Sequence, residues 1–153
     1  MIHMSSLAEI QDFLAPKRMA FAGASRNPKK FGGVVFSELR KRGFDLFPVH
    51  PEASELEGIP CVRSVRDLPP GLENLYIVTP AKETAGVVRD ALEYGIRKIW
   101  IQQSSDTPEA LELAREKGVP VIHGRCMMMF AEPVGSIHGF HRWIIRLFGR
   151  YPK

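Results

Sequence analysis

The chain has 153 residues, of which 44% are hydrophobic and 25% are charged, the size and balance of one globular domain with its own core. No apolar run approaches the roughly 18 residues needed to cross a bilayer, and residues 1–7 have neither the basic flank nor the apolar centre of a secretion signal. The two cysteines form no C-x-x-C pair, which excludes a disulfide scaffold and a cysteine-rich zinc module. We therefore expect a cytoplasmic protein that does not span a membrane.

The net charge of +4 belongs to the end of the chain. Residues 1–132 hold 17 basic and 17 acidic side chains, whereas residues 133–153 hold all of the excess basic ones. A neutral body lacks the broad positive face that binding to a phosphate backbone needs. We expect no general nucleic-acid binding.

The first half of the chain carries alternating helix and strand signals. A capping-box pattern at Ser6 and Glu9 opens an amphipathic stretch, and Pro16 ends it. The patterns predict, in chain order, a helix at residues 6–15, a strand at 18–22, a turn-rich loop at 23–28, a helix around 34–39 that ends at Gly43, a strand at 45–49, and a proline-rich loop at 51–72 with one helical turn at 64–68.

The second half continues the alternation. We predict a strand at 75–78, a helix with Thr79 as its N-cap that runs to Tyr94 and closes at Gly95, a strand at 98–101, a helix at 106–118, and a strand at 119–122. The apolar runs are continuous, as in strands that are covered on both faces. The sequence therefore predicts a Rossmann-like, doubly wound α/β fold with a mainly parallel five-stranded sheet and helices on both faces.

The loop after the first predicted strand is the first place to look for a ligand, because ligands of such sheets lie beyond the carboxyl ends of the strands. Gly23 can form the turn, and Gly32 and Gly33 allow backbone or ligand to approach closely. Their spacing is not G-x-G-x-x-G, and the chain has no G-K-[ST]. The dinucleotide fingerprint and the P-loop are therefore both missing.

Charge in this loop favours a ligand with more than one phosphate. Arg26, Lys29 and Lys30 lie within five positions of one another, although exposed basic residues are also ordinary in loops. A nicotinamide dinucleotide site would place an acidic residue at the end of the second strand. This chain has Pro48-Val-His-Pro51 there, which disfavours a nicotinamide site.

Seven segments now identify a resemblance. They are Ala22-Gly-Ala-Ser-Arg-Asn-Pro28, Lys30-Phe-Gly32, Pro48-Val-His-Pro51, Ile59-Pro-Cys61, Asp67-Leu-Pro69, Trp100-Ile-Gln102 and Gly124-Arg-Cys126. In this order, and over about residues 15–130, the chain resembles the small stand-alone coenzyme A-binding proteins, whose fold is similar to the CoA-binding domain of the succinyl-CoA synthetase alpha subunit.

The resemblance implies which residues meet the ligand. Gly23, Ser25, Lys30 and Gly32 would line the CoA phosphates and the start of the pantetheine arm. The turns at residues 49–51 and 78–81 would contact the adenosine and the pyrophosphate. The full set of expected cofactor-binding residues is Gly23, Ala24, Ser25, Arg26, Lys29, Lys30, Phe31, Gly32, His50, Pro51, Val78, Thr79 and Pro80.

The chain departs from the family pattern at two places. The family usually has Asn at the position of His50, where His can serve instead as a turn residue. It usually continues the Trp-x-Gln segment with Leu-Gly or Gln-x-Gly, whereas this chain has Gln103-Ser-Ser105.

Other reactive side chains are better explained by structural roles. His123 follows the last predicted strand without an identified acid or base partner. Cys126 could exchange with the CoA thiol, but an apolar run follows it, and Cys61 is a weaker candidate. His138 and His141 have the spacing of two metal ligands, yet nothing nearby completes a set. We expect no catalytic residue and no metal site.

Residues 133–153 form an extension to the expected domain at 1–132. Between His138 and Arg150, basic residues recur at four-residue intervals beside an apolar stripe, which predicts a basic amphipathic C-terminal helix. Such a helix docks on its own domain or on a second copy, or binds an acidic partner or an anionic membrane surface.

Three hypotheses for function follow. The first is a non-catalytic module that binds coenzyme A or an acyl-CoA, with no enzymatic activity of its own. The second is a subunit of an enzyme that handles acyl-CoA or thiols. Succinyl-CoA synthetases use a phosphohistidine in a second domain, for which this chain has no room, so a partner would supply the catalytic domain. The third is a sensor that binds a nicotinamide or adenine nucleotide.

Overall fold

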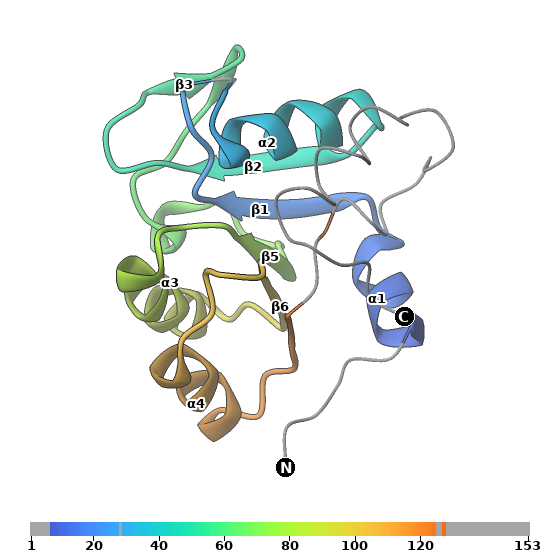
Figure 1. Ribbon diagram of the computed structural model, residues 1–153, viewed down its shortest axis with the longest axis vertical. Helices are drawn as coiled ribbons and strands as arrows, with labels where there is room; N and C mark the ends of the chain where they lie inside the picture. Colours follow the sequence, from blue (N-terminus) through green and yellow to red (C-terminus); the bar gives the residue numbers. More distant parts are fainter. Residues whose placement is uncertain (1–6, 28, 125–126, 128–153) are drawn as a thin grey trace.

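A five-stranded parallel sheet forms the centre of the molecule (Figure 1). The computed structural model describes residues 7–27, 29–124 and 127. Across the sheet the strands follow the order β2 (Asp45–Val49), β1 (Arg18–Ala22), β5 (Asn74–Ile77), β6 (Lys98–Ile101) and β7 (Val121–His123). The predicted doubly wound, Rossmann-like α/β fold is confirmed.

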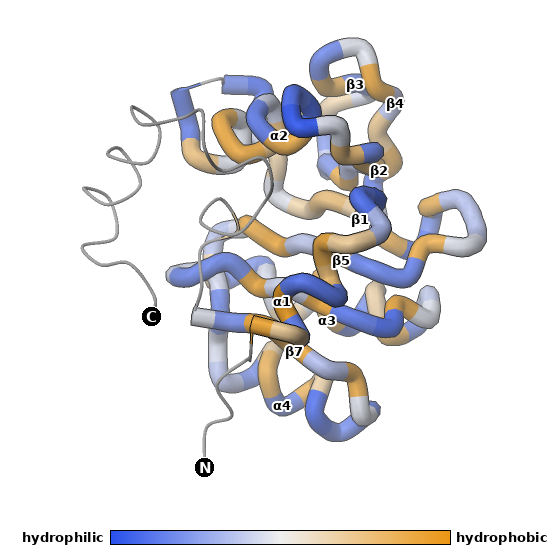
Figure 2. The backbone as a smooth tube through the Cα atoms, turned by 90° about the vertical axis from the view of Figure 1, so that its right-hand side faces the viewer, coloured by the Kyte–Doolittle hydropathy of each residue, from blue (hydrophilic) through white to orange (hydrophobic). Residues whose placement is uncertain are grey.

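Helices cover both faces of this sheet and divide the core into two clusters. α1 (Leu7–Leu14) and α2 (Phe31–Lys41) pack on one face, through residues such as Phe13 and Phe36. α3 (Ala81–Tyr94) and α4 (Pro108–Glu116) pack on the other, through small residues such as Ala91 and Ala114. Figure 2 shows hydrophobic stretches along the strands and hydrophilic ones on the outer turns of the helices.

The point where the winding changes direction lies between β1 and β5. The chain leaves β1 to form α2 on one face, and it leaves β5 to form α3 on the opposite face. β1 and β5 are neighbours in the sheet, with Ala22 beside Ile77. Their carboxyl ends therefore border the crevice in which open α/β sheets bind ligands.

A small antiparallel hairpin was missed by the sequence patterns. β3 (Glu55–Leu56) and β4 (Ile59–Pro60) pair within the region predicted as a loop. Each strand has only two residues, too few to show alternation, and the turn is made by Glu57 and Gly58, both with positive φ. The predicted helical turn at 64–68 is present as a 3₁₀ turn, η1 (Val65–Asp67).

The predicted start of α3 is wrong in its detail. Pro80 occupies the N-cap position without a side-chain hydrogen bond, whereas Thr79 turns inward and its Oγ1 lies 2.8 Å from Thr84 Oγ1. α4 begins two residues after the predicted start, with Thr107 as its N-cap, because Thr107 Oγ1 accepts from Ala110 N at 3.1 Å.

Three further expectations stand as follows. Among the described residues no helix is long and apolar enough to span a membrane. The capping box at Ser6 and the C-terminal helix predicted between His138 and Arg150 lie outside the described residues. The division into residues 1–132 and 133–153 stays a prediction.

Candidate ligand site at the carboxyl edge

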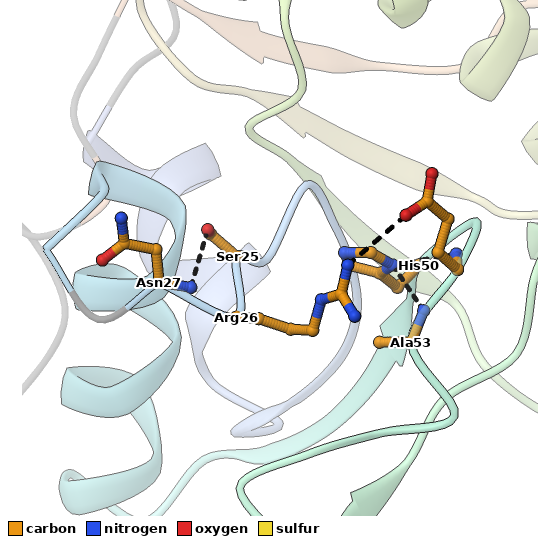
Figure 3. Close-up of polar contacts among 6 residues, drawn as sticks. Ser25, Arg26, Asn27, His50 and Ala53 are labelled. Atoms are coloured by element: carbon orange, nitrogen blue, oxygen red, sulfur yellow. Dashed lines mark hydrogen bonds and ion pairs between the residues drawn. The ribbon is translucent and has the colours of Figure 1, made fainter.

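Three segments meet where β1, β2 and β5 end. They are residues 23–30 after β1, 50–53 after β2 and 78–80 after β5. Val78 N donates to Ala22 O at 2.8 Å, which extends the β1–β5 ladder into the site. Arg26 Nη2 reaches Glu52 Oε2 at 3.3 Å and joins the first segment to the second (Figure 3).

Glycines pack the first segment tightly against its neighbours. A Cβ at Gly23, where φ is +103°, would lie 2.5 Å from the backbone carbon of Val78. A Cβ at Gly32 would lie 2.2 Å from Gly23 O, and one at Gly33 would lie 2.5 Å from Asn27 O. Backbone therefore requires all three glycines: the backbone of the third segment at Gly23, and the loop's own backbone at Gly32 and Gly33. For Gly32 and Gly33, close approach of backbone is one of the two possibilities that the sequence left open.

The loop between them is folded by its own side chains. Ser25 Oγ accepts from Asn27 N at 3.1 Å (Figure 3), and Asn27 Oδ1 accepts from Lys29 N at 2.9 Å. Lys30 N donates to Asn27 O at 3.1 Å. These Ser and Asx turns hold the loop in one shape and direct the chain into α2 at Phe31.

The amino end of α2 has no side-chain cap. Lys30 is its N-cap and gives the helix no side-chain hydrogen bond, so the positive end of the helix dipole is not met by a polar side chain of the N-cap. Lys29 and Lys30 are exposed, and neither has an ion-pair partner within the described part of the chain. The helix dipole and two lysines thus favour a phosphate at the same place.

Arg26 lies in a different environment from the two lysines. Arg26 forms an ion pair with Glu52, and the two side chains are 62% and 75% exposed, respectively. An exposed pair of this kind contributes little stability. A polyanionic ligand can therefore draw Arg26 away from Glu52 at small cost.

His50 explains how the second segment turns. Its Nδ1 accepts from Glu52 N at 3.0 Å and from Ala53 N at 2.8 Å (Figure 3). An Asn carbonyl would accept the same N–H groups, so His50 acts as the turn residue that the family's Asn suggests. Because Nδ1 must stay unprotonated to accept, the turn requires neutral histidine. Burial and the nearby Arg26 charge lower the pKa of His50 below its usual value, and Glu52 opposes this shift.

Replacing His50 by asparagine should reduce the pH dependence of stability. A pKa that is lower in the folded state than in the unfolded chain makes protonation favour unfolding. The stabilisation is therefore complete above the unfolded value of 6.5 and is lost as pH falls through the folded value. We expect the wild type to lose more stability than His50→Asn between about pH 7.5 and 5.5, measured by urea unfolding. Equal losses would contradict this role.

In the third segment, residues 78–80, the backbone is better placed than the side chains to contact a ligand. Thr79 is 8% exposed, and its carbonyl accepts from Ser105 Oγ at 2.7 Å. Val78 is half-buried and Pro80 is exposed. Ser105 thus fixes the third segment from the loop after β6, a role that the sequence did not reveal.

The remaining predicted residues divide between core and surface. Ala24 is buried and Phe31 packs against the core, whereas Pro51 is exposed. A cavity of about 400 Å³ adjoins the loop, between α2 and the hairpin. It is lined by Ser25, Arg26, Gly33, Phe36, Ser37, Glu55, Leu56 and Glu57.

Two reactive side chains have defined surroundings. His123 Nδ1 lies 3.8 Å from Asp106 Oδ2, an acidic neighbour that the sequence did not identify. Asp106 was missed because only the parallel β6–β7 pairing brings the two loops together. The pKa of Cys61 is raised by burial and by Glu55, which leaves less thiolate for exchange chemistry.

The other candidates cannot be placed in the same way. Cys126, His138 and His141 lie outside the described residues. Within the described residues, no group of three His, Cys, Asp or Glu side chains has the arrangement of a metal site.

Comparison with known proteins gives one family match. A family model described as a CoA binding domain matches residues 17–132. The Bacillus subtilis protein YneT, described as uncharacterized, is 28% identical over 123 residues, which cover 80% of this chain and 91% of that protein. A hypothetical protein from Pyrococcus horikoshii has a solved structure that is 30% identical, with a TM-score of 0.77, covering 84% of this chain and 93% of that one.

A longer relative contains the same domain. The alpha subunit of an ADP-forming acetate–CoA ligase II from Pyrococcus furiosus is 27% identical over 126 residues. The match covers 75% of this chain but only 28% of that subunit. The chain therefore corresponds to about a quarter of the ligase subunit.

Proposed function

The chain belongs to the CoA-binding domain family, and from this membership and the geometry of the carboxyl edge we propose that it binds coenzyme A or an acyl-CoA there, as a binding or regulatory module without catalysis. The observation that carries the proposal is the uncapped amino end of α2 beside two exposed lysines, Lys29 and Lys30. A ligand with several phosphates satisfies these groups together.

The phosphates of CoA bind at the amino end of α2. The positive end of the α2 dipole and the charges of Lys29 and Lys30 stabilise them there. The folded loop supports the proposal because its shape is already set by Ser25 and Asn27. Binding then orders little chain, which reduces the entropic cost.

The nucleotide end of the ligand occupies the cavity between α2 and the hairpin. Phe36 and Leu56 give it apolar walls that suit an adenine ring, and Arg26 lies at its edge beside the second segment. In this arrangement Arg26 exchanges Glu52 for a ligand phosphate. The turn at His50 and Pro51 forms the neighbouring wall.

Calorimetric titration tests this function. We expect coenzyme A to bind with a micromolar dissociation constant that rises with salt, because charged contacts to phosphate are screened. ATP and NAD serve as controls for a general phosphate or nucleotide site. Binding of NAD with equal or greater affinity would favour the nucleotide sensor instead, and binding of none of the three would overturn the proposal.

A second candidate function is favoured by the ligase relative. There the matching domain is part of a longer subunit of an enzyme named for a CoA ligation. This chain would then supply the CoA site to a catalytic partner. Purification of the chain from its native source with a second, stoichiometric polypeptide would support this function, and its recovery alone would support the independent module.

A further inference from the structure

Gln102 occupies a buried position at the carboxyl edge, one strand beyond β5. It follows β6 directly, and its backbone N donates to Ile77 O at 2.8 Å. The side chain is 1% exposed. Because side chains alternate along a strand, Gln102 lies on the same face as Trp100, which belongs to the core beneath α1 and α2.

The orientation of the Gln102 amide is fixed by two donors. Tyr76 Oη donates to Gln102 Oε1 at 2.6 Å, and Met127 N donates to the same oxygen at 3.2 Å. A backbone N–H only donates, so a flipped amide would bring two donors together. Gln102 Nε2 therefore points away from both groups. It is buried and has no acceptor among the described residues.

A buried amide donor without an acceptor is uncommon and unfavourable. This donor lies at the edge where the candidate site is built and on the face from which α2 rises. β6 is separated from β1 by β5, so Gln102 lies about 10 Å across the sheet from the end of β1, two strand spacings. An extended pantetheine arm spans that distance from phosphates held at α2.

We propose that Gln102 Nε2 donates to a carbonyl oxygen on the pantetheine–thioester arm of the bound ligand. The inference rests on the proposed function. A neutral amide suits a neutral carbonyl, whereas the phosphates prefer the charged groups at α2. The arm carries two amide carbonyls, and an acyl-CoA adds the thioester carbonyl. Gln102 thus contributes to ligand specificity through a hydrogen bond to the arm, and this contact does not involve the nucleotide.

The test compares two variants with three ligands. Tyr76→Phe is the reference, and Tyr76→Phe/Gln102→Met also removes the amide. The apolar pair leaves no hydroxyl without its acceptor, and Met preserves the unbranched shape. Met127 N loses its acceptor in the double variant, so adenosine 3′,5′-bisphosphate serves as the control for any change in the rest of the site. The ligands are coenzyme A, acetyl-CoA and adenosine 3′,5′-bisphosphate, which lacks the arm. Calorimetry gives the affinities, and thermal unfolding confirms the folded state of each variant.

We expect the double variant to bind acetyl-CoA about 3- to 10-fold more weakly than the reference, and adenosine 3′,5′-bisphosphate equally well. A matching loss for coenzyme A identifies an amide carbonyl as the acceptor, and a loss confined to acetyl-CoA identifies the thioester. Equal affinities for all three ligands, or an equal loss for all three, would overturn the inference. Failure of the wild type to bind coenzyme A would instead overturn the proposed function.

Discussion

Replacing Gly32 by alanine is expected to destabilise the domain by about 3 kcal/mol or more. The added Cβ would lie 2.2 Å from Gly23 O, a backbone atom that cannot rotate away. Relief requires α2 to move from the loop, which also breaks the site. Urea unfolding measures the loss of stability, and calorimetry of the protein that remains folded should detect no binding of coenzyme A.

The control for this change is Gly86→Ala. Gly86 lies within α3, is exposed, and has no atom within 4 Å of its added Cβ. Alanine there should stabilise the helix by about 0.5–1 kcal/mol, because it restricts the unfolded chain. Equal effects of the two substitutions would show that the contact at Gly32 does not limit the packing of the loop.

Reversing the charge of Lys29 and Lys30 together is expected to weaken binding of coenzyme A by at least about 100-fold. Each charge-assisted contact to phosphate contributes roughly 1.5–3 kcal/mol, and the introduced carboxylates repel the ligand as well. The stability of the Lys29→Glu/Lys30→Glu variant should stay within about 0.5 kcal/mol of the wild type, because the side chains are exposed. Calorimetry across a salt series and urea unfolding measure the two effects.

Lys41→Glu/Lys117→Glu is the matched control for charge. Lys41 ends α2 and Lys117 ends α4, so both lie at the opposite edge of the sheet while the net charge changes equally. We expect less than a threefold loss of affinity from this pair. Comparable losses of affinity in both double variants would indicate a long-range charge effect. They would contradict the assignment of Lys29 and Lys30 to the binding site.

The fold followed closely from local patterns. The continuous apolar runs at 18–22, 45–49 and 98–101 became strands with these same bounds, since a parallel strand buried on both faces leaves such a run. The positive φ at Gly43 and Gly95 is as the helix ends required. The hairpin was missed because its two-residue strands carry no periodicity.

The candidate site could be predicted only as a set of segments. The sequence placed Lys29 and Lys30 beside the amino end of a helix, but it could not indicate that Arg26 pairs with Glu52. It also could not indicate that His50 accepts two backbone hydrogen bonds. The surroundings of Gln102 depend on Tyr76 and Met127, which parallel pairing brings together from distant parts of the chain.

Mapping of backbone amide chemical shifts during titration with coenzyme A tests the central claim most directly. The account predicts saturable shifts that are largest at residues 23–33, 50–53 and 78–80, the three segments that follow β1, β2 and β5. It predicts small shifts at the opposite edge, around α1 and the end of α4. Shifts that are centred on that opposite edge, or that are absent at saturating coenzyme A, would contradict the account.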